Sequence, residues 1–202
     1  CKEDENQFYE IGGFRIISYL LSDANPAFLT YHLYTRFFTI YQSLKNEKLQ
    51  EVLFSHILVD ISIWYVSDEI LLILKYIHRV VLPSSEHFAS KYFNFEEILK
   101  TIFSFFTSQE THRNRSETID LTNCRRILYS IISLKMPKNS EFQFLLYSAT
   151  YFNQDLEIKN ELILFIDHFS KIQKEQFIKC ISKEEITSSL LKLVQKSINI
   201  TP

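Results

Sequence analysis

The chain has 202 residues and a formal net charge of −2, from 22 basic and 24 acidic residues. This balance provides no global electrostatic field that would favour nucleic acid or an anionic membrane as a partner. Glycine and proline are scarce, at 2 and 4 residues. Their scarcity excludes turn-rich all-β folds and sheets with phosphate-binding loops, and it indicates an all-α fold.

Three cysteines lie far apart in the sequence, and no two of them form a Cys-x-x-Cys pair. We therefore interpret the cysteines as small apolar packing residues in a reducing compartment and not as a disulfide framework. They are Cys1, Cys124 and Cys180. No apolar run approaches the ~20 residues that a membrane-spanning helix requires. Because the first residue is not methionine, we expect the chain to be a piece of a longer protein.

The N-terminal part of the chain predicts three helices after a polar start. Residues 1–7 predict a frayed lead-in. A short helix is expected within 8–21. Asn25-Pro26 places a proline where a first helical turn tolerates it, so a long helix is expected to run from there through residue 44. A third helix is expected over 49–57.

The segment 59–64, VDISIW, alternates strictly between apolar and polar residues, which is typical of a strand. A lone six-residue strand would have no partner in a chain of this composition. We therefore interpret the segment as a helix end and an apolar corner, filled by Trp64, the only tryptophan.

Two amphipathic helices are predicted at the centre of the chain, where apolar residues recur at helical spacing. Ser67-Asp68-Glu69 indicates the cap and acidic first turn of the first helix, and Asn94 indicates the cap of the second. The first helix is marked by Ile70, Ile73, Leu74, Ile77, Val80 and Val81, and the second by Phe95, Ile98, Leu99, Ile102, Phe103 and Phe106.

The C-terminal half opens with the longest polar stretch, residues 107–120, which predicts a surface loop or a disordered insertion. Ser182-Lys183-Glu184-Glu185 is a capping box that predicts the start of a last helix. The remaining expected elements are helices over 121–136, 142–149 and 156–169, a short turn at 177–181 and a frayed tail at 199–202.

Three predicted helices open alike, at Phe14, Ile98 and Ile186, with spacings of 84 and 88 residues. Each spacing is about twice the ~40–47 residues of a HEAT or armadillo unit. The periodicity favours an armadillo/HEAT-like α-solenoid of roughly five helical pairs over a closed bundle. This solenoid is expected to form a single domain over 8–198, with 107–120 as its polar loop.

No motif for nucleophilic, phosphate-binding or zinc chemistry is present: the chain lacks Gly-x-Ser-x-Gly, a Gly-rich loop and His-Glu-x-x-His. The Glu96-Glu97 and Glu184-Glu185 pairs lie in predicted first helical turns, where the macrodipole favours carboxylates. We therefore predict no catalytic residue, no cofactor and no metal site. A helical enzyme with an unrecognised site is kept only as a third hypothesis.

One basic cluster could meet phosphate head groups or an acidic partner at the surface. Acidic residues within the same stretch dilute its charge, so a solvated loop is the favoured interpretation. The cluster consists of His112, Arg113, Arg115, Arg125 and Arg126.

The stretch around Trp64 resembles the armadillo-like helical region of BEACH-domain proteins, the neurobeachin family. An apolar pair and a short polar step lead to the tryptophan, and Ser-Asp, a helix and a Phe-x-x-Lys-Tyr element follow. The resemblance covers most of 8–195. The residues that carry it are Trp64, Ser67, Asp68, Phe88, Lys91 and Tyr92.

The resemblance implies a non-catalytic scaffold segment of a large cytoplasmic protein that acts in vesicle traffic and membrane dynamics. Expected partners are proteins, with no nucleic acid and no small-molecule substrate, and with peripheral membrane association through other parts of the full-length protein. The alternative is a protein-binding solenoid of another family: a GTPase-binding formin regulatory domain, a transport receptor or a tethering subunit.

Overall fold

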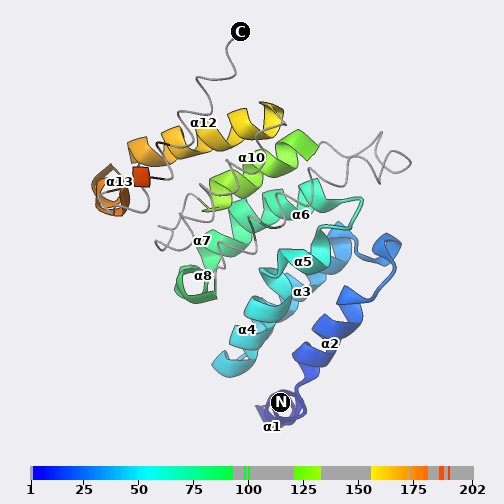
Figure 1. Ribbon diagram of the computed structural model, residues 1–202. Coiled ribbons are helices and arrows are strands. Elements are labelled where there is room, and N and C mark those ends of the chain that lie inside the picture. The colour runs from blue at the N-terminus through cyan, green and yellow to red at the C-terminus, as the bar shows by residue number, and fades with distance from the viewer. Residues whose placement is uncertain are drawn as a thin grey trace. The chain divides into compact units, whose positions relative to one another are not determined.

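The computed structural model describes residues 2–92, 98, 100, 121–132, 156–172, 174–181, 187–188 and 191. All regular elements within these residues are helices (Figure 1), so the predicted all-α fold is confirmed. The chain divides into two compact units, 1–131 and 132–202, and the single domain over 8–198 stays a prediction. Each unit is described below by itself.

The first unit begins with two short helices, α1 (Lys2–Glu10) and α2 (Gly13–Ser22). Gly12 joins them in the left-handed conformation, with φ of 69°, which a residue without Cβ adopts at little cost. A Cβ on Gly13 would lie 2.3 Å from the ring of Phe8, so the close approach of the two helices depends on the absence of a side chain there.

A frayed lead-in is predicted for 1–7, but residues 2–7 belong to α1. The carboxylate of Glu5 accepts hydrogen bonds from the backbone N–H groups of Lys45 (3.1 Å) and Asn46 (2.8 Å). The ring of Phe8 meets that of Phe14 edge-on at 4.9 Å. These tertiary contacts order a segment whose composition by itself is typical of a solvated end.

The long helix expected through residue 44 is divided into a 3₁₀ turn, η1 (Pro26–Phe28), and α3 (Tyr31–Ser43). Asn25 caps the turn by accepting from the backbone N–H of Ala27 at 3.0 Å, and Thr30 caps α3 by accepting from that of Leu33 at 3.1 Å. Two capping residues so close together start two helices instead of one.

Two of the following helices change from α to π geometry along their length. The helix α4 (Glu47–Leu53) continues as η2 (Phe54–Leu58), and α6 (Ile70–Tyr76) continues as η3 (Ile77–Val81). The two π-helices start 23 residues apart. The sequence predicted both segments as helical, but apolar spacing does not distinguish the wider π turn from an α turn.

The remaining elements of the first unit are short, apart from α10. A single turn, α5 (Ile61–Trp64), forms the predicted corner, and α7 (Leu82–Ser84) ends the η3 helix. Then follow α8 (Glu86–Tyr92) and α10 (Leu121–Ile132), of which all but the last residue lie in this unit. The hydroxyl of Ser130 on α10 lies 3.2 Å from Nε2 of His78 on η3.

The core of the first unit comes from the predicted apolar faces. Helix α3 contacts α4, η2 and α6, and α2 contacts α4, η2 and α5. The fully buried side chains include those of Tyr34, Leu53, Phe54, Ile57, Leu58, Trp64, Ile70, Ile73 and Leu74. Cys124 is also buried and is in no disulfide, as predicted for a packing cysteine.

The second unit contains α12 (Leu156–Ile172) and α13 (Lys174–Ile181), which contact each other. Leu162 and Phe165 of α12 are buried. The segment 177–181, expected as a short turn, belongs instead to the α13 helix.

Several predictions fall outside the described residues. They are the Asn94 cap and most of the helix that follows it, the polar stretch 107–120, the helix 142–149, the capping box at 182–185 and the tail 199–202. Within the predicted second central helix, Ile98 is described and buried. The number of helical pairs therefore stays a prediction.

Candidate functional site

Trp64 lies in the core of the first unit. Its side chain is fully buried, and its Nε1–H donates a hydrogen bond of 2.7 Å to the carbonyl of Ile57. That carbonyl belongs to the last turn of the π-helix η2, where backbone acceptors lack partners within the helix. The indole therefore fills the corner, as predicted, and also satisfies a buried backbone group.

Tyr34 of α3 completes the same arrangement from another helix. Its hydroxyl donates a hydrogen bond of 2.8 Å to the carbonyl of Leu58, the neighbour of Ile57. Its ring meets that of Trp64 edge-on, at 5.0 Å and 81°. Burial raises the pKa of the Tyr34 hydroxyl well above its usual value, and the nearby Tyr76 raises it further. The phenol therefore stays protonated and acts as a donor.

Ser67 is buried and connects two helices, but it is not the expected helix cap. The helix α6 begins at Ile70, three residues later, and its N-cap residue Glu69 makes no side-chain capping bond. The Ser67 hydroxyl donates to the carbonyl of Leu29 and accepts from the backbone N–H of Glu69 at 3.1 Å. This hydroxyl thus ties the turn before α6 to the turn before α3.

Glu69 contributes its charge to a helix other than its own. Its carboxylate accepts a hydrogen bond from the backbone N–H of Tyr31, the first residue of α3. A carboxylate at a helix N-terminus is stabilised by the helix macrodipole. Asp68, by contrast, is exposed, and among the residues that the structure describes it makes no side-chain hydrogen bond. The carboxylate that was expected in the first turn of α6 therefore stabilises the N-terminus of α3 instead.

Phe88 and Tyr92 of α8 extend this core. Phe88 is buried, and its ring lies 5.7 Å from that of Phe54 and 6.4 Å from that of Tyr41. The Tyr92 ring lies 6.4 Å from that of Phe88. Aromatic pairs at such separations add to the free energy of burial, so the Phe-x-x-Lys-Tyr element fastens α8 to η2 and α3.

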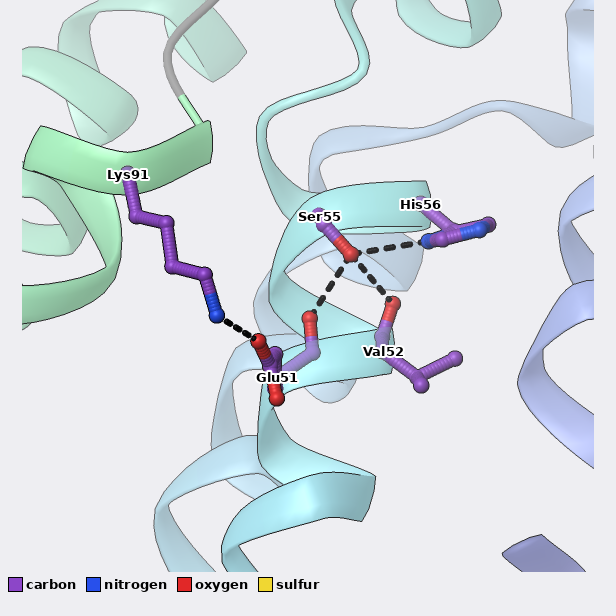
Figure 2. Close-up of polar contacts among 5 residues, drawn as sticks. All are labelled: Glu51, Val52, Ser55, His56 and Lys91. Carbon is purple, nitrogen blue, oxygen red and sulfur yellow. Dashed lines mark hydrogen bonds and ion pairs between the residues drawn. The ribbon is translucent and has the colours of Figure 1, made fainter.

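Lys91 reaches from α8 to α4, where its Nζ lies 2.5 Å from a carboxylate oxygen of Glu51 (Figure 2). The same ammonium lies 4.8 Å from the ring centroid of Tyr92. The Lys91 side chain is 60% exposed, and exposed ion pairs contribute little to stability. The Lys91–Glu51 ion pair therefore links α8 to α4 at the protein surface but adds little to stability.

Ser55 and His56 resemble a nucleophile and its base, with 2.8 Å between Oγ and Nδ1 (Figure 2); the Ser130–His78 contact, at 3.2 Å, is a second pair of this type among the described residues. The Ser55 hydroxyl also donates to the carbonyl of Glu51 at 2.8 Å. Because its one hydrogen points at that carbonyl, the hydroxyl accepts from the imidazole and is not deprotonated by it. The contact secures the helix and does not activate a nucleophile.

The predicted basic surface is partly wrong. Arg125 is fully buried on the inward face of α10, next to Cys124 and one turn before Leu128, which are themselves buried. Arg126 is exposed. His112, Arg113 and Arg115 lie outside the described residues. Adjacent residues of a helix point about 100° apart, so one of two neighbouring arginines can face the core while the other faces solvent, and their neighbourhood in sequence does not make a patch.

A shallow hollow of about 230 Å³ opens beside the α1–α2 turn, over Leu49 and Val52 of α4. Arg15 and Glu10 lie at it with opposite charges, and Tyr9 also lines it. Across the part of the chain that the structure covers, no group of three or more metal-ligating side chains occurs. No helix within these residues is long and apolar enough to cross a membrane.

The family comparison agrees with this picture of a packed helical array. The family model described as the neurobeachin/BDCP, DUF4704 alpha solenoid region matches residues 2–201. No curated protein and no solved structure matches the chain. The motif residues that the sequence singled out serve mainly as core and helix contacts, while Tyr34 was missed. Its spacing of three and four residues from Phe37 and Phe38 is the signal that could have indicated it.

Proposed function

Because the chain belongs to the neurobeachin/BDCP alpha-solenoid family, we propose that it is a non-catalytic scaffold segment of a large BEACH-type protein. Its role is to present helical surfaces to protein partners in vesicle traffic and membrane dynamics, on the cytoplasmic side of membranes. Peripheral membrane association comes from other parts of that protein. The family match sets aside the formin, transport-receptor and tethering-subunit alternatives.

The proposal rests on one observation: three of the motif residues are buried in contacts between segments of the chain. Trp64, Ser67 and Phe88 are buried. The indole N–H of Trp64 and the hydroxyl of Ser67 donate to backbone carbonyls of other segments, and the Phe88 ring packs against the Phe54 ring. Side chains that are buried in packing contacts cannot contact a substrate. The shorter of the two serine–histidine contacts, Ser55–His56, lacks the geometry of an activated nucleophile. An array of stacked helices instead offers extended surfaces for proteins.

Balanced charge supports protein partners over nucleic acid. With 22 basic and 24 acidic residues, the chain has no excess of cations to neutralise phosphates, which provide most of the affinity in nucleic-acid binding.

Two experiments test the proposal. The first is the complete open reading frame around these residues: a BEACH domain in the same protein is expected, and its absence overturns the assignment. The second is proximity labelling in cells with the full-length protein, comparing the intact protein with one that lacks residues 2–201. Loss of a set of trafficking proteins from the labelled fraction is expected.

Matched point variants sharpen the second experiment. Trp64→Ala removes the buried indole and is expected to reproduce the deletion, whereas Asp68→Ala changes an exposed side chain and is expected to leave the labelled set unchanged. If the deletion leaves both the labelled proteins and vesicle traffic unchanged, the segment is not a scaffold. If traffic is impaired while every labelled protein is retained, the scaffold role is also wrong.

A further inference from the structure

The outward face of α2 carries large apolar side chains that nothing covers among the described residues. Ile16 is 53% exposed, Tyr19 73% and Leu20 61%. The opposite face of the helix, including the buried Phe14, packs on α1, α4, η2 and α5. Figure 1 shows α2 at the edge of the first unit. Contiguous exposed apolar side chains of this size mark an interaction surface.

Two charges frame this face, and both lie at the unfavourable end of their own helix. Arg15 is in the first turn of α2 and Asp23 is its C-cap residue. The macrodipole disfavours a cation at the N-terminus and an anion at the C-terminus. Both side chains are exposed, and within the described part of the chain neither has a side-chain hydrogen bond or an ion pair.

The spacing of these charges makes the face complementary to itself. Arg15, Tyr19 and Asp23 are four residues apart, so they lie in one row along the helix, with Ile16 and Leu20 beside them. When two such rows are antiparallel and centred on Tyr19, position 15 of each faces position 23 of the other. Twofold contacts of this kind pair residue i with j and j with i.

We propose that α2 docks on α2 of a second copy of this chain, antiparallel and about a twofold axis at Tyr19. Arg15 then pairs with Asp23 of the partner subunit, and the apolar side chains of the two helices pack between these two ion pairs. Each charge also comes to lie near the end of the partner helix whose dipole it complements. A contact made by one helix from each copy is small, so the dimer is weak and reversible.

The test is sedimentation velocity of the 202-residue chain over a wide range of protein concentration. A reversible monomer–dimer equilibrium is expected. R15E and D23R should each weaken the dimer at least about tenfold, because each places like charges at both ends of the contact. Tyr19→Asp should abolish it. The control is R79E, which makes the same change of charge at an exposed position outside the contact.

Mixing the two charge variants gives the decisive measurement. In an equimolar mixture of R15E and D23R chains, both ends of the heterodimer carry opposite charges, so dimerisation should return to the level of the unsubstituted chain. Far-UV circular dichroism checks that each variant is folded, and R15Q replaces R15E if that variant is not. A chain that stays monomeric at every concentration overturns the proposal. So does a dimer that is insensitive to R15E, or a mixture that fails to restore association.

Discussion

Trp64 and Tyr34 meet edge-on, at 5.0 Å between ring centroids, and donate to two successive carbonyls, those of Ile57 and Leu58. Both carbonyls belong to the end of the π-helix η2. A helix end buried in a core needs partners for such acceptors. Two aromatic side chains from different helices provide them, so the packing of α3 and α5 depends on the π geometry of η2.

The indole N–H of Trp64 can be removed while most of its apolar bulk is kept. Trp64→Phe leaves the buried carbonyl of Ile57 without its donor and is expected to lower the free energy of unfolding by about 1–3 kcal/mol, with a further cost for the lost volume. Urea denaturation measures the change. Asp68→Ala, at an exposed position, should stay within about 0.5 kcal/mol. Equal effects of the two substitutions would contradict the structural role given to Trp64.

The raised pKa of Tyr34 predicts a loss of stability in alkali. Below the usual pKa of 10.0, the phenol is protonated in both the folded and the unfolded chain, and its contribution is fully present. As the pH rises above that value, the unfolded chain releases this proton while the folded chain retains it. The free energy of unfolding therefore falls, by up to about 1.4 kcal/mol per pH unit for one proton.

Tyr34→Phe tests this origin directly. Between neutral pH and pH values above 10.0, urea denaturation of the variant should show a smaller loss of stability than the unsubstituted chain. Tyr76, whose pKa is also raised, leaves a residual dependence, so Tyr76→Phe is the companion variant. An alkaline dependence that Tyr34→Phe does not change would contradict the assignment.

The two adjacent glycines should respond differently to alanine. Gly13→Ala places a methyl group against the Phe8 ring and is expected to destabilise the fold by about 1 kcal/mol or more. In a Phe8→Ala background the same substitution should become neutral or stabilising, by up to about 1 kcal/mol, because alanine favours helix. Gly12→Ala strains a left-handed residue, at about 1–2 kcal/mol, and its cost should persist in either background. Thermal unfolding of the two glycine variants, of Phe8→Ala and of the two double variants distinguishes these outcomes.

Arg125 and Arg126 are neighbours in sequence with opposite environments. Arg125→Ala removes a fully buried side chain and the interactions of its guanidinium group, and it is expected to destabilise the fold by about 2–4 kcal/mol. Arg126→Ala, at an exposed position, should stay within about 0.5 kcal/mol. Urea denaturation compares the two. A small effect at both positions would restore the interpretation of Arg125 as a surface charge.

Local sequence is sufficient to predict those helices whose apolar residues recur at regular spacing. The apolar spacing from Ile70 to Val81 predicts the buried face of α6 and η3, and a corner at Trp64 is favoured over a strand because a lone strand has no partner. Where the prediction failed, a partner distant in sequence decided the outcome. Residues 2–7 are helical because Glu5 binds backbone groups at 45 and 46. Ser67 lies three residues before α6, and its hydroxyl connects the N–H of Glu69 to the carbonyl of Leu29, 38 residues away.

The sequence by itself determined that this chain is all-α, that Trp64 is buried and to which family it belongs, because apolar periodicity and short motifs are local properties. Only the tertiary structure decided that Tyr34 is the companion of Trp64, that Arg125 lies inside, and that Ile16, Tyr19 and Leu20 lie outside. The physical reason is that an amphipathic pattern specifies one face of a helix, whereas burial and pairing depend on which other helices come to cover it.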